Sequence, residues 1–309
     1  MLIEQIPAPQ LARRLRTEGV RLTTGAFTVH LHLSGRTVVQ EFARLYARYP
    51  VEQQPGIDDA RIRVGPAPWY RRLGGATAHT FADEFPAVKP VPMDRAFTAL
   101  ETGLNWGVMR SGAAPIIMHS AVLERHGRAM LMPAPSGSGK STLAAALALR
   151  GWRLLSDEMA VFSFEDFEVI PNPRPVSLKN KAIEVIGAFA PDAIFSRTFV
   201  GTPKGDVAYM RAPDEALARL HQRARPNLVL IPKYQAGADT TLRRLGRSEA
   251  FNWLIESTGS YPTMLDTGFG LLARLVESCG LYALEYSNLD QAIALLTRVS
   301  DEHENSDPD

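Results

Sequence analysis

The chain has 309 residues, with 34 lysines and arginines against 33 aspartates and glutamates, so its formal net charge is +1. A charge this close to zero provides no overall field for nucleic acid or an anionic membrane, and we expect neither as a partner. The single cysteine, Cys279, cannot form an internal disulfide, and no apolar run approaches the length of a membrane span. We therefore expect a cytoplasmic protein without a membrane span, in which Cys279 is a packed small residue.

The length allows two domains, and the first, residues 1–111, is expected to be a small α+β domain. Apolar residues alternate within 27–33, which is typical of a strand with one buried face. The elements expected here are helices at 8–18, 38–49 and 94–111, strands at 27–33 and 60–64, and a loop rich in proline, glycine and arginine at 65–75.

The most specific motif is Ala-Pro-Ser-Gly-Ser-Gly-Lys-Ser-Thr at residues 134–142. In the pattern G-x-x-x-x-G-K-[ST], backbone amides surround the phosphates, the lysine reaches the β and γ groups, and the hydroxyl binds Mg²⁺. Ala134 replaces the first glycine of this pattern. We expect a nucleoside triphosphate site, with ATP and Mg²⁺ as cofactors, formed by Ser136, Gly137, Ser138, Gly139, Lys140, Ser141 and Thr142.

The segments on either side of this loop support that interpretation. Residues 128–132 are short and apolar, which predicts a buried strand, and residues 141–150 are strong helix formers followed by Gly151 as a C-terminal cap. Strand, loop and helix therefore occur in the required order, and the helix N-terminus adds partial positive charge at the phosphates.

Two acids are expected next to the loop. Residues 152–155 predict a strand that returns after the turn at Gly151 and ends at Asp157 and Glu158. A carboxylate there can bind Mg²⁺ or accept the proton of an acceptor hydroxyl. The alternative is a solvated acidic turn without a catalytic role.

The remainder of the second domain, residues 112–300, has fewer informative residues, and an acidic, disordered tail is expected at 301–309. Lys204 and Arg211 can approach the phosphates if their flexible segment closes, or they are ordinary solvated cations. The expected elements are a hairpin at 159–164 and 167–170, a loop and strand at 202–211, a strand at 226–232, and helices at 248–277 and 288–299.

His119 lies in an apolar segment, residues 116–122, which is expected to be a strand ahead of the loop and in which a lone histidine is usually a core residue. Three segments, His119-Ser-Ala-Val, Ser136-Gly-Ser-Gly-Lys-Ser and Arg150-Gly-Trp-Arg-Leu-Leu-Ser-Asp-Glu, together resemble the C-terminal catalytic domain of bacterial HPr kinase/phosphorylase. The whole chain is similar to the HprK-related kinase A group. This resemblance implies an α/β, P-loop fold of the HPr-kinase-like (phosphoenolpyruvate-carboxykinase-like) kind over residues 112–300.

The resemblance also implies a reaction, the transfer of the γ-phosphate of ATP to a hydroxyl, such as a Ser or Thr of a protein or peptide. Lys140 would stabilise charge and His119 would tune the acids. Of Asp157 and Glu158, one would bind the metal with Ser141 and the other would serve as base, without an indication of which does which.

The sequence departs from HPr kinases at Ser177, which occupies the place of a glutamate metal ligand. Their long phosphorolysis loop is not recognisable either, so we do not expect the reverse, phosphorylase activity. Two alternatives remain open, a regulator that senses nucleotide without phosphate transfer and a kinase of a small metabolite. The acceptor and the oligomeric state are not indicated, although a homo-oligomer is compatible with the sequence.

Overall fold

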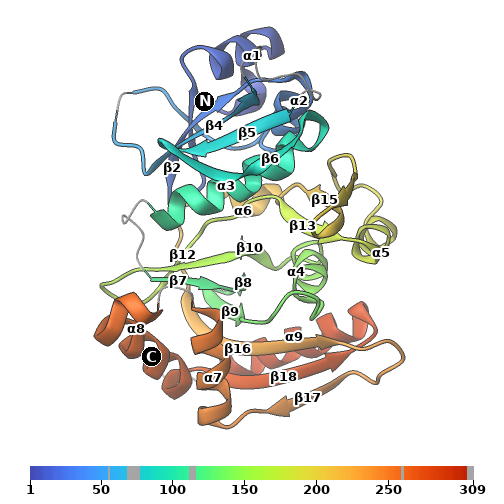
Figure 1. Ribbon diagram of the computed structural model, residues 1–309. Helices are drawn as coiled ribbons and strands as arrows, with labels where there is room; N and C mark the ends of the chain where they lie inside the picture. Colours follow the sequence, from blue (N-terminus) through green and yellow to red (C-terminus); the bar gives the residue numbers. More distant parts are fainter. Residues whose placement is uncertain (55, 68–76, 111–115, 259–260, 305–309) are drawn as a thin grey trace. The chain divides into compact units, whose positions relative to one another are not determined.

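The computed structural model describes residues 1–54, 56–67, 77–110, 116–258 and 261–304. It is a mixed α/β structure, as expected, and divides into two compact units (Figure 1). The first unit comprises Met1–Ala114, Ser177–Glu184 and Asp192–Leu217; the second comprises Pro115–Val176, Val185–Pro191 and Ala218–Asp309. Two later segments of the chain therefore belong to the same unit as the N-terminal region.

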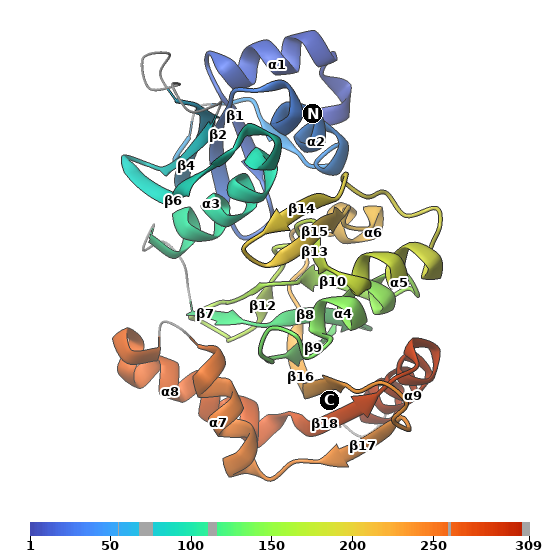
Figure 2. The same ribbon diagram turned by 45° about the vertical axis from the view of Figure 1, so that its right-hand side comes forward.

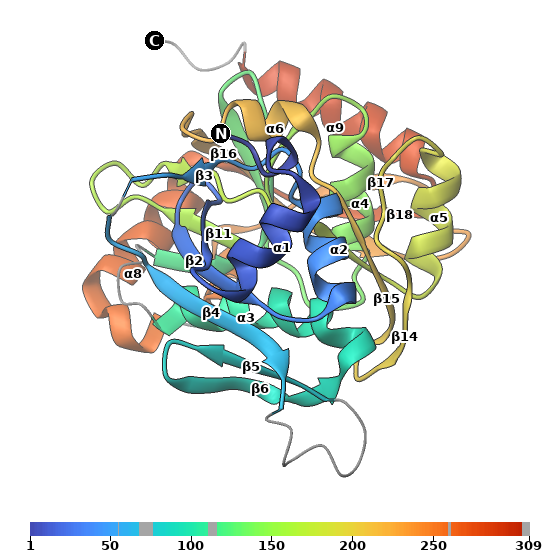
Figure 3. The same cartoon turned by 90° about the horizontal axis from the view of Figure 1, so that it is seen from above.

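The first unit is built on a six-stranded sheet with the strand order β3-β1-β2-β4-β5-β6. Its helices and strands are η1 (Ile3–Gln5), α1 (Ala8–Arg16), β1 (Val20–Thr23), β2 (Thr28–Leu33), α2 (Arg36–Leu45), β3 (Val51–Glu52), β4 (Ala60–Pro66), β5 (Thr77–Ala82), β6 (Phe85–Pro92), η3 (Met93–Arg95) and α3 (Ala96–Arg110). Figure 3 shows this unit from above, with α3 running beside β4, β5 and β6, on which it packs.

The alternation in β2 accounts for the one-sided burial of this sheet. Val29, Leu31 and Leu33 are buried, whereas His30 and His32 on the opposite face are only half-buried. The predicted strand and its buried face are thus confirmed. Of the loop predicted at 65–75, residues 65 and 66 belong to β4, and residues 68–75 lie outside the described part of the chain.

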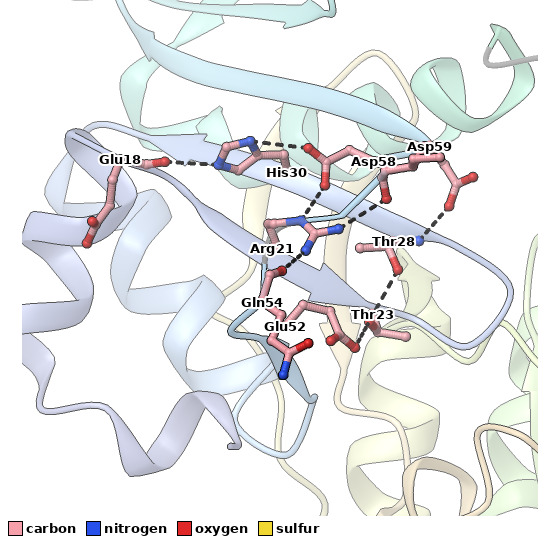
Figure 4. Close-up of polar contacts among 10 residues, drawn as sticks. Glu18, Arg21, Thr23, Thr28, His30, Glu52, Gln54, Asp58 and Asp59 are labelled. Atoms are coloured by element: carbon pink, nitrogen blue, oxygen red, sulfur yellow. Dashed lines mark hydrogen bonds and ion pairs between the residues drawn. The ribbon is translucent and has the colours of Figure 1, made fainter.

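Arg21 organises the connection between β3 and β4 (Figure 4). Its guanidinium donates to the Asp58 carboxylate at 2.5 Å and to the carbonyl oxygens of Gln54 and Ile57. His30 lies 3.5 Å from the same carboxylate. Because β2 and β4 are parallel, the chain must cross over between them, and these contacts anchor the end of that crossover.

The two later segments add a second, three-stranded sheet, ordered β13-β15-β14. Its strands are β13 (Val176–Lys179), β14 (Phe199–Thr202) and β15 (Gly205–Met210), and α6 (Asp214–Ala218) follows β15. The helix α5 (Lys181–Phe189) begins in the first of these segments and continues into residues of the second unit. Within the first unit, Phe97 of α3 packs against Phe199 and Tyr209, with ring centroids 6.1 and 5.2 Å apart. This aromatic cluster explains why residues 192–217 group with the N-terminal unit.

The second unit contains a six-stranded sheet ordered β10-β8-β9-β16-β18-β17 and a three-stranded sheet ordered β12-β11-β7. The strands are β7 (Ile116–His119), β8 (Ala121–Arg125), β9 (Arg128–Met132), β10 (Arg153–Ser156), β11 (Met159–Phe162), β12 (Val169–Ile170), β16 (Arg225–Tyr234), β17 (Thr241–Arg244) and β18 (Gly280–Tyr286). The helices are α4 (Lys140–Ala148), α7 (Arg247–Ser257), α8 (Tyr261–Ser278) and α9 (Leu289–Glu304). Figure 2 shows α7 and α8 side by side and α9 beside β18.

The strand directions decide which residues meet at the edge of the large sheet. β9, β16 and β18 are parallel, while β8 is antiparallel to both β9 and β10. It follows that β10 also runs parallel to β9. The residues that come directly after β9, β10, β16 and β18 therefore lie at the same edge.

Three segments differ from the sequence predictions. The strand expected at 116–122 is two strands in different sheets, β7 and β8, separated at Ser120, whose hydroxyl donates to the Ala121 carbonyl. The helix expected at 248–277 is two, α7 and α8. The last helix continues to Glu304, into the residues expected as a tail, because Asp301 accepts a hydrogen bond from Arg125 at 2.9 Å.

Within the described ranges, no helix combines the length and the apolar character needed to cross a membrane.

Candidate nucleotide site

The phosphate-binding motif forms the connection between β9 and α4, in the order predicted. Gly137 and Gly139 have φ angles of +91° and +89°, a left-handed conformation that glycine adopts without steric cost. A Cβ atom on Gly139 would lie 2.6 Å from Tyr286 Oη and 2.8 Å from Tyr234 Cβ, whereas one on Gly137 would meet nothing within 4 Å. Gly139 is thus required by space as well as by conformation.

The start of α4 is suited to an anion. Gly139 is the N-cap residue and offers no side-chain hydrogen bond, and the first turn contains no acidic residue. The first backbone N–H groups of a helix have no partner within it, so they are available to a phosphate. Along the loop, Ser136 and Gly137 are exposed, and Ser138, Gly139, Ser141 and Thr142 are half-buried.

Lys140 of α4, His119 of β7 and the backbone of Glu158, in the connection between β10 and β11, lie close together. Lys140 is only 6 % exposed, and its Nζ lies 3.0 Å from His119 Nε2. His119 Nδ1 lies 3.1 Å from the backbone carbonyl of Glu158, and His119 pairs with Met159 across β7 and β11.

These two contacts bear on the hydrogen atoms of the imidazole. A carbonyl oxygen only accepts and an ammonium group only donates, so the arrangement fits a proton on Nδ1 and an accepting Nε2. The Nε2 atom of His119 is the one that contacts the lysine of the loop. His119 is thus a residue outside the motif that contacts the motif's lysine.

The two acids follow β10, at the same edge of the sheet as the loop that follows β9. Asp157 is 5 % exposed and Glu158 is half-buried, so neither lies on a freely solvated turn. The strand that carries them is held by a buried ion pair, in which Arg153 of β10 donates to Glu124 of β8. Both partners of that pair are almost fully buried, which fixes β10 against its neighbour.

A magnesium site is compatible with these residues. Mg²⁺ prefers hard oxygen ligands and usually takes only one or two protein carboxylates, with the remainder from phosphates and water. Asp157 supplies a carboxylate and Ser141 a hydroxyl at the same edge. In the part of the chain that the structure describes, no group of three or more His, Cys, Asp or Glu side chains converges as a metal site, so phosphate oxygens would be needed.

Lys204, Arg211 and Ser177 belong to the first unit, not to the unit that contains the phosphate loop. Lys204 is exposed in the turn between β14 and β15, where its backbone N–H donates to Thr202 Oγ1. Arg211 forms an ion pair of 3.2 Å with Asp214. Their approach to the phosphates stays a prediction.

Tyr234 and Tyr286 also contact the loop, and the sequence motifs do not include them. The backbone N–H of Tyr234 donates to the Ser138 carbonyl at 2.8 Å, and Tyr286 Oη donates to the Gly139 carbonyl at 3.1 Å. Burial raises the pKa of Tyr286 above its usual value, so the hydroxyl stays protonated and able to donate. The only sequence signal was their position at the ends of apolar strands, which is shared by many residues without such a role.

Comparison with solved structures finds distant similarities, with 22 matching chains. The HPr(Ser) kinase/phosphatase from Coxiella burnetii is similar to this chain at 11% sequence identity and a TM-score of 0.27. The match covers 61% of this chain and 97% of that protein. No family model and no curated protein match the sequence. Because this similarity is so low, the function must be inferred from the residues of the site.

Proposed function

We propose that the protein is an ATP-dependent kinase that transfers the γ-phosphate to an acceptor hydroxyl. The contact between Lys140 and His119, with His119 bonded in turn to the backbone carbonyl of Glu158, is the observation that carries this proposal. Motors, switches and transporters share the phosphate loop. A phosphotransferase needs in addition groups that orient or deprotonate the acceptor, and His119 and two acids at the same edge of the sheet would supply them.

Each residue would have a distinct task. The loop amides and Lys140 would stabilise the charge that develops on the transferred group. Ser141 and one of Asp157 and Glu158 would hold Mg²⁺, which would supply positive charge at the phosphates. The other acid would accept the proton of the attacking hydroxyl, and His119 would tune the site through its hydrogen bonds to Lys140 and to the backbone carbonyl of Glu158.

The acceptor class rests on the resemblance to HPr kinases, which suggests a Ser or Thr of a protein or peptide in a bacterial cytoplasm. Fold-level analogy does not identify a substrate, so the acceptor must come from experiment.

The test compares ATP binding and phosphate transfer in the same preparations. Purified protein with Mg²⁺ and γ-labelled ATP is incubated with bacterial cytosolic proteins and, separately, with a panel of hydroxylated metabolites. Asp157→Asn is expected to bind ATP but to lower the transfer rate about 10²–10⁴-fold, the range for loss of an acid–base group. Glu165→Gln, an exposed acid of the same unit, serves as the control and should leave the rate unchanged.

Phosphosite mapping by mass spectrometry then identifies the acceptor. Transfer that is equally fast in Asp157→Asn would contradict the assigned chemistry. ATP binding without transfer to any protein or metabolite would favour a nucleotide-sensing regulator, and transfer to a metabolite alone would point to a small-molecule kinase.

A further inference from the structure

Two tyrosines meet the phosphate loop on the side of β9 opposite to the acids. In the large sheet β9 lies between β8 and β16, and β10 lies beyond β8. Asp157 and Glu158 follow β10, whereas Tyr234 ends β16 and Tyr286 ends β18. Tyr234 and Tyr286 are direct partners in the parallel β16–β18 pair.

These tyrosines differ in exposure. Tyr286 is 1% exposed, and its hydroxyl is bonded to the Gly139 carbonyl. Tyr234 is 51% exposed, although its backbone is bonded to Ser138 and its Cβ adjoins Gly139. The rings meet edge to face, with centroids 5.8 Å apart and an interplanar angle of 74°. The buried ring thus supports an exposed ring that stands next to the loop.

A bound triphosphate has two chemically different ends. Its γ end is expected near Lys140, whose amine contacts His119 of β7. β7 pairs with β11, which in turn contacts β8 and β10, so this end points away from β16. The sugar and base must extend from the loop in another direction. On the β16 side, an exposed aromatic ring lies next to Gly139. Stacking on an aromatic side chain is a common and energetically useful way to hold a nucleobase.

We propose that Tyr234 stacks on the base of the bound nucleotide and that Tyr286 is a positioning residue, which supports the Tyr234 ring and fixes the Gly139 carbonyl. This inference deepens the proposed function and rests on it for the presence of a nucleoside triphosphate. Every nucleobase has a π face, so stacking alone would accept any base. The proposal therefore assigns Tyr234 to base affinity and leaves the choice among bases to other contacts.

The experiment measures the affinity of the full chain for ATP and for inorganic tripolyphosphate by calorimetry, both with Mg²⁺. Tripolyphosphate can occupy the loop but has no base. Its affinity therefore shows whether a substitution has distorted the loop, whereas a loss for ATP alone shows a loss of base stacking. Tyr234→Leu keeps the apolar bulk without the ring, and Tyr234→Phe keeps the ring without the hydroxyl. Phe164→Ala removes a different exposed aromatic, 54% exposed, from the same unit as a control.

Tyr234→Leu is expected to weaken the binding of ATP about 5- to 100-fold, which is the usual effect of losing one stacking contact with a base. The affinity for tripolyphosphate should stay within about twofold of that of the unmodified protein. Tyr234→Phe and Phe164→Ala should bind both ligands as the unmodified protein does. An equal loss for ATP and tripolyphosphate would mean that Tyr234 shapes the loop, and no loss for either would mean that the base lies elsewhere; both results overturn the proposal.

Failure of the proposed function gives a different result. If the unmodified protein binds neither ATP nor tripolyphosphate, nucleotide binding itself is wrong and the stacking proposal falls with it. If it binds both, only the Tyr234 variants decide whether stacking is correct.

Discussion

Gly139 shows at the residue scale why a motif position is restricted to one amino acid. Its φ of +89° is costly for any residue with a Cβ, and that Cβ would overlap Tyr286 and Tyr234. Gly137 has a similar φ of +91° but faces open space. A comparison of Gly137 with Gly139 therefore distinguishes the cost of backbone strain from the cost of steric overlap.

Gly139→Ala is expected to weaken ATP binding strongly and to lower the free energy of unfolding by more than the roughly 1–2 kcal/mol of left-handed strain alone. Gly137→Ala should show the strain without the overlap, and thus a smaller loss of both quantities. Calorimetry with ATP and urea denaturation measure the two effects. Equal losses in the two variants would show that the overlap with the tyrosines is relaxed at no cost.

Cys279 gives a residue-scale prediction that does not depend on function. It is buried between α8 and β18, and burial raises the pKa of its thiol from 9.0 to about 12. At pH 8 its thiolate fraction is then roughly 10⁻⁴, so a disulfide reagent should react slowly with the native protein and rapidly in denaturant. Fast stoichiometric reaction in the native state would contradict this burial.

The raised pKa of Cys279 also makes the free energy of unfolding depend on pH in a defined direction. Between pH 9 and 12 the unfolded chain loses the thiol proton while the native protein keeps it, so the unfolded state binds fewer protons. The contribution of Cys279 to stability is therefore complete below pH 9 and is lost as pH rises through that interval. Cys279→Ser should flatten this part of the curve of unfolding free energy against pH.

At the scale of elements, the placement of β10 decides where the two acids arrive. Arg153 donates to Glu124 and also to the backbone carbonyls of Arg219 and Gln222, at 3.0 and 2.8 Å. Glu124 accepts a further bond from the Gly127 N–H at 2.6 Å. One buried ion pair thus connects β8, β10 and the turn before β9.

Glu124→Gln is expected to destabilise the protein by about 3–5 kcal/mol, because it leaves the buried Arg153 charge without its counter-ion. Glu249→Gln is the matched control, since it breaks an arginine pair on the surface, where solvent screening leaves little to lose. Urea denaturation of the two variants makes the comparison. Similar midpoints would mean that the ion pair contributes no more than an exposed one.

At the scale of the whole molecule, the chain does not divide at one position. Residues 192–217 follow the phosphate loop in sequence but belong to the N-terminal unit through Phe199 and Tyr209. Arg95 also donates to the Gly201 carbonyl at 2.7 Å. The first unit therefore cannot complete its core until the later segment has been made.

Phe199→Ala is expected to lower the stability of the first unit by about 3–5 kcal/mol, the usual cost of removing a buried phenyl ring. Hydrogen exchange should increase in α3, which carries Phe97, and remain unchanged in α4. Val200→Ala, at a neighbouring position that is 63% exposed, should have little effect. Unchanged protection of α3 in Phe199→Ala would contradict the assignment of this segment to the first unit.

The predictions from the sequence succeeded where the determining residues are neighbours in the chain. The strand of 128–132, the glycine loop and the following helix are each specified by a short window of residues, and the alternation in β2 defines its buried face. The same local reasoning joined β7 to β8, because an apolar run does not show that its two halves enter different sheets.

By itself, the sequence determined the phosphate loop, its flanking strand and helix, and the mixed α/β class, since these depend on local propensity and the conformational freedom of glycine. Only the tertiary structure decided which distant residues meet it. His119 reaches Lys140 because β7 pairs with β11, which begins directly after the two acids. Tyr286 reaches Gly139 across 147 positions of sequence because the ends of the parallel strands meet at one edge of the large sheet. Hydrophobic periodicity records which face of a strand is buried, not which strand lies next to it.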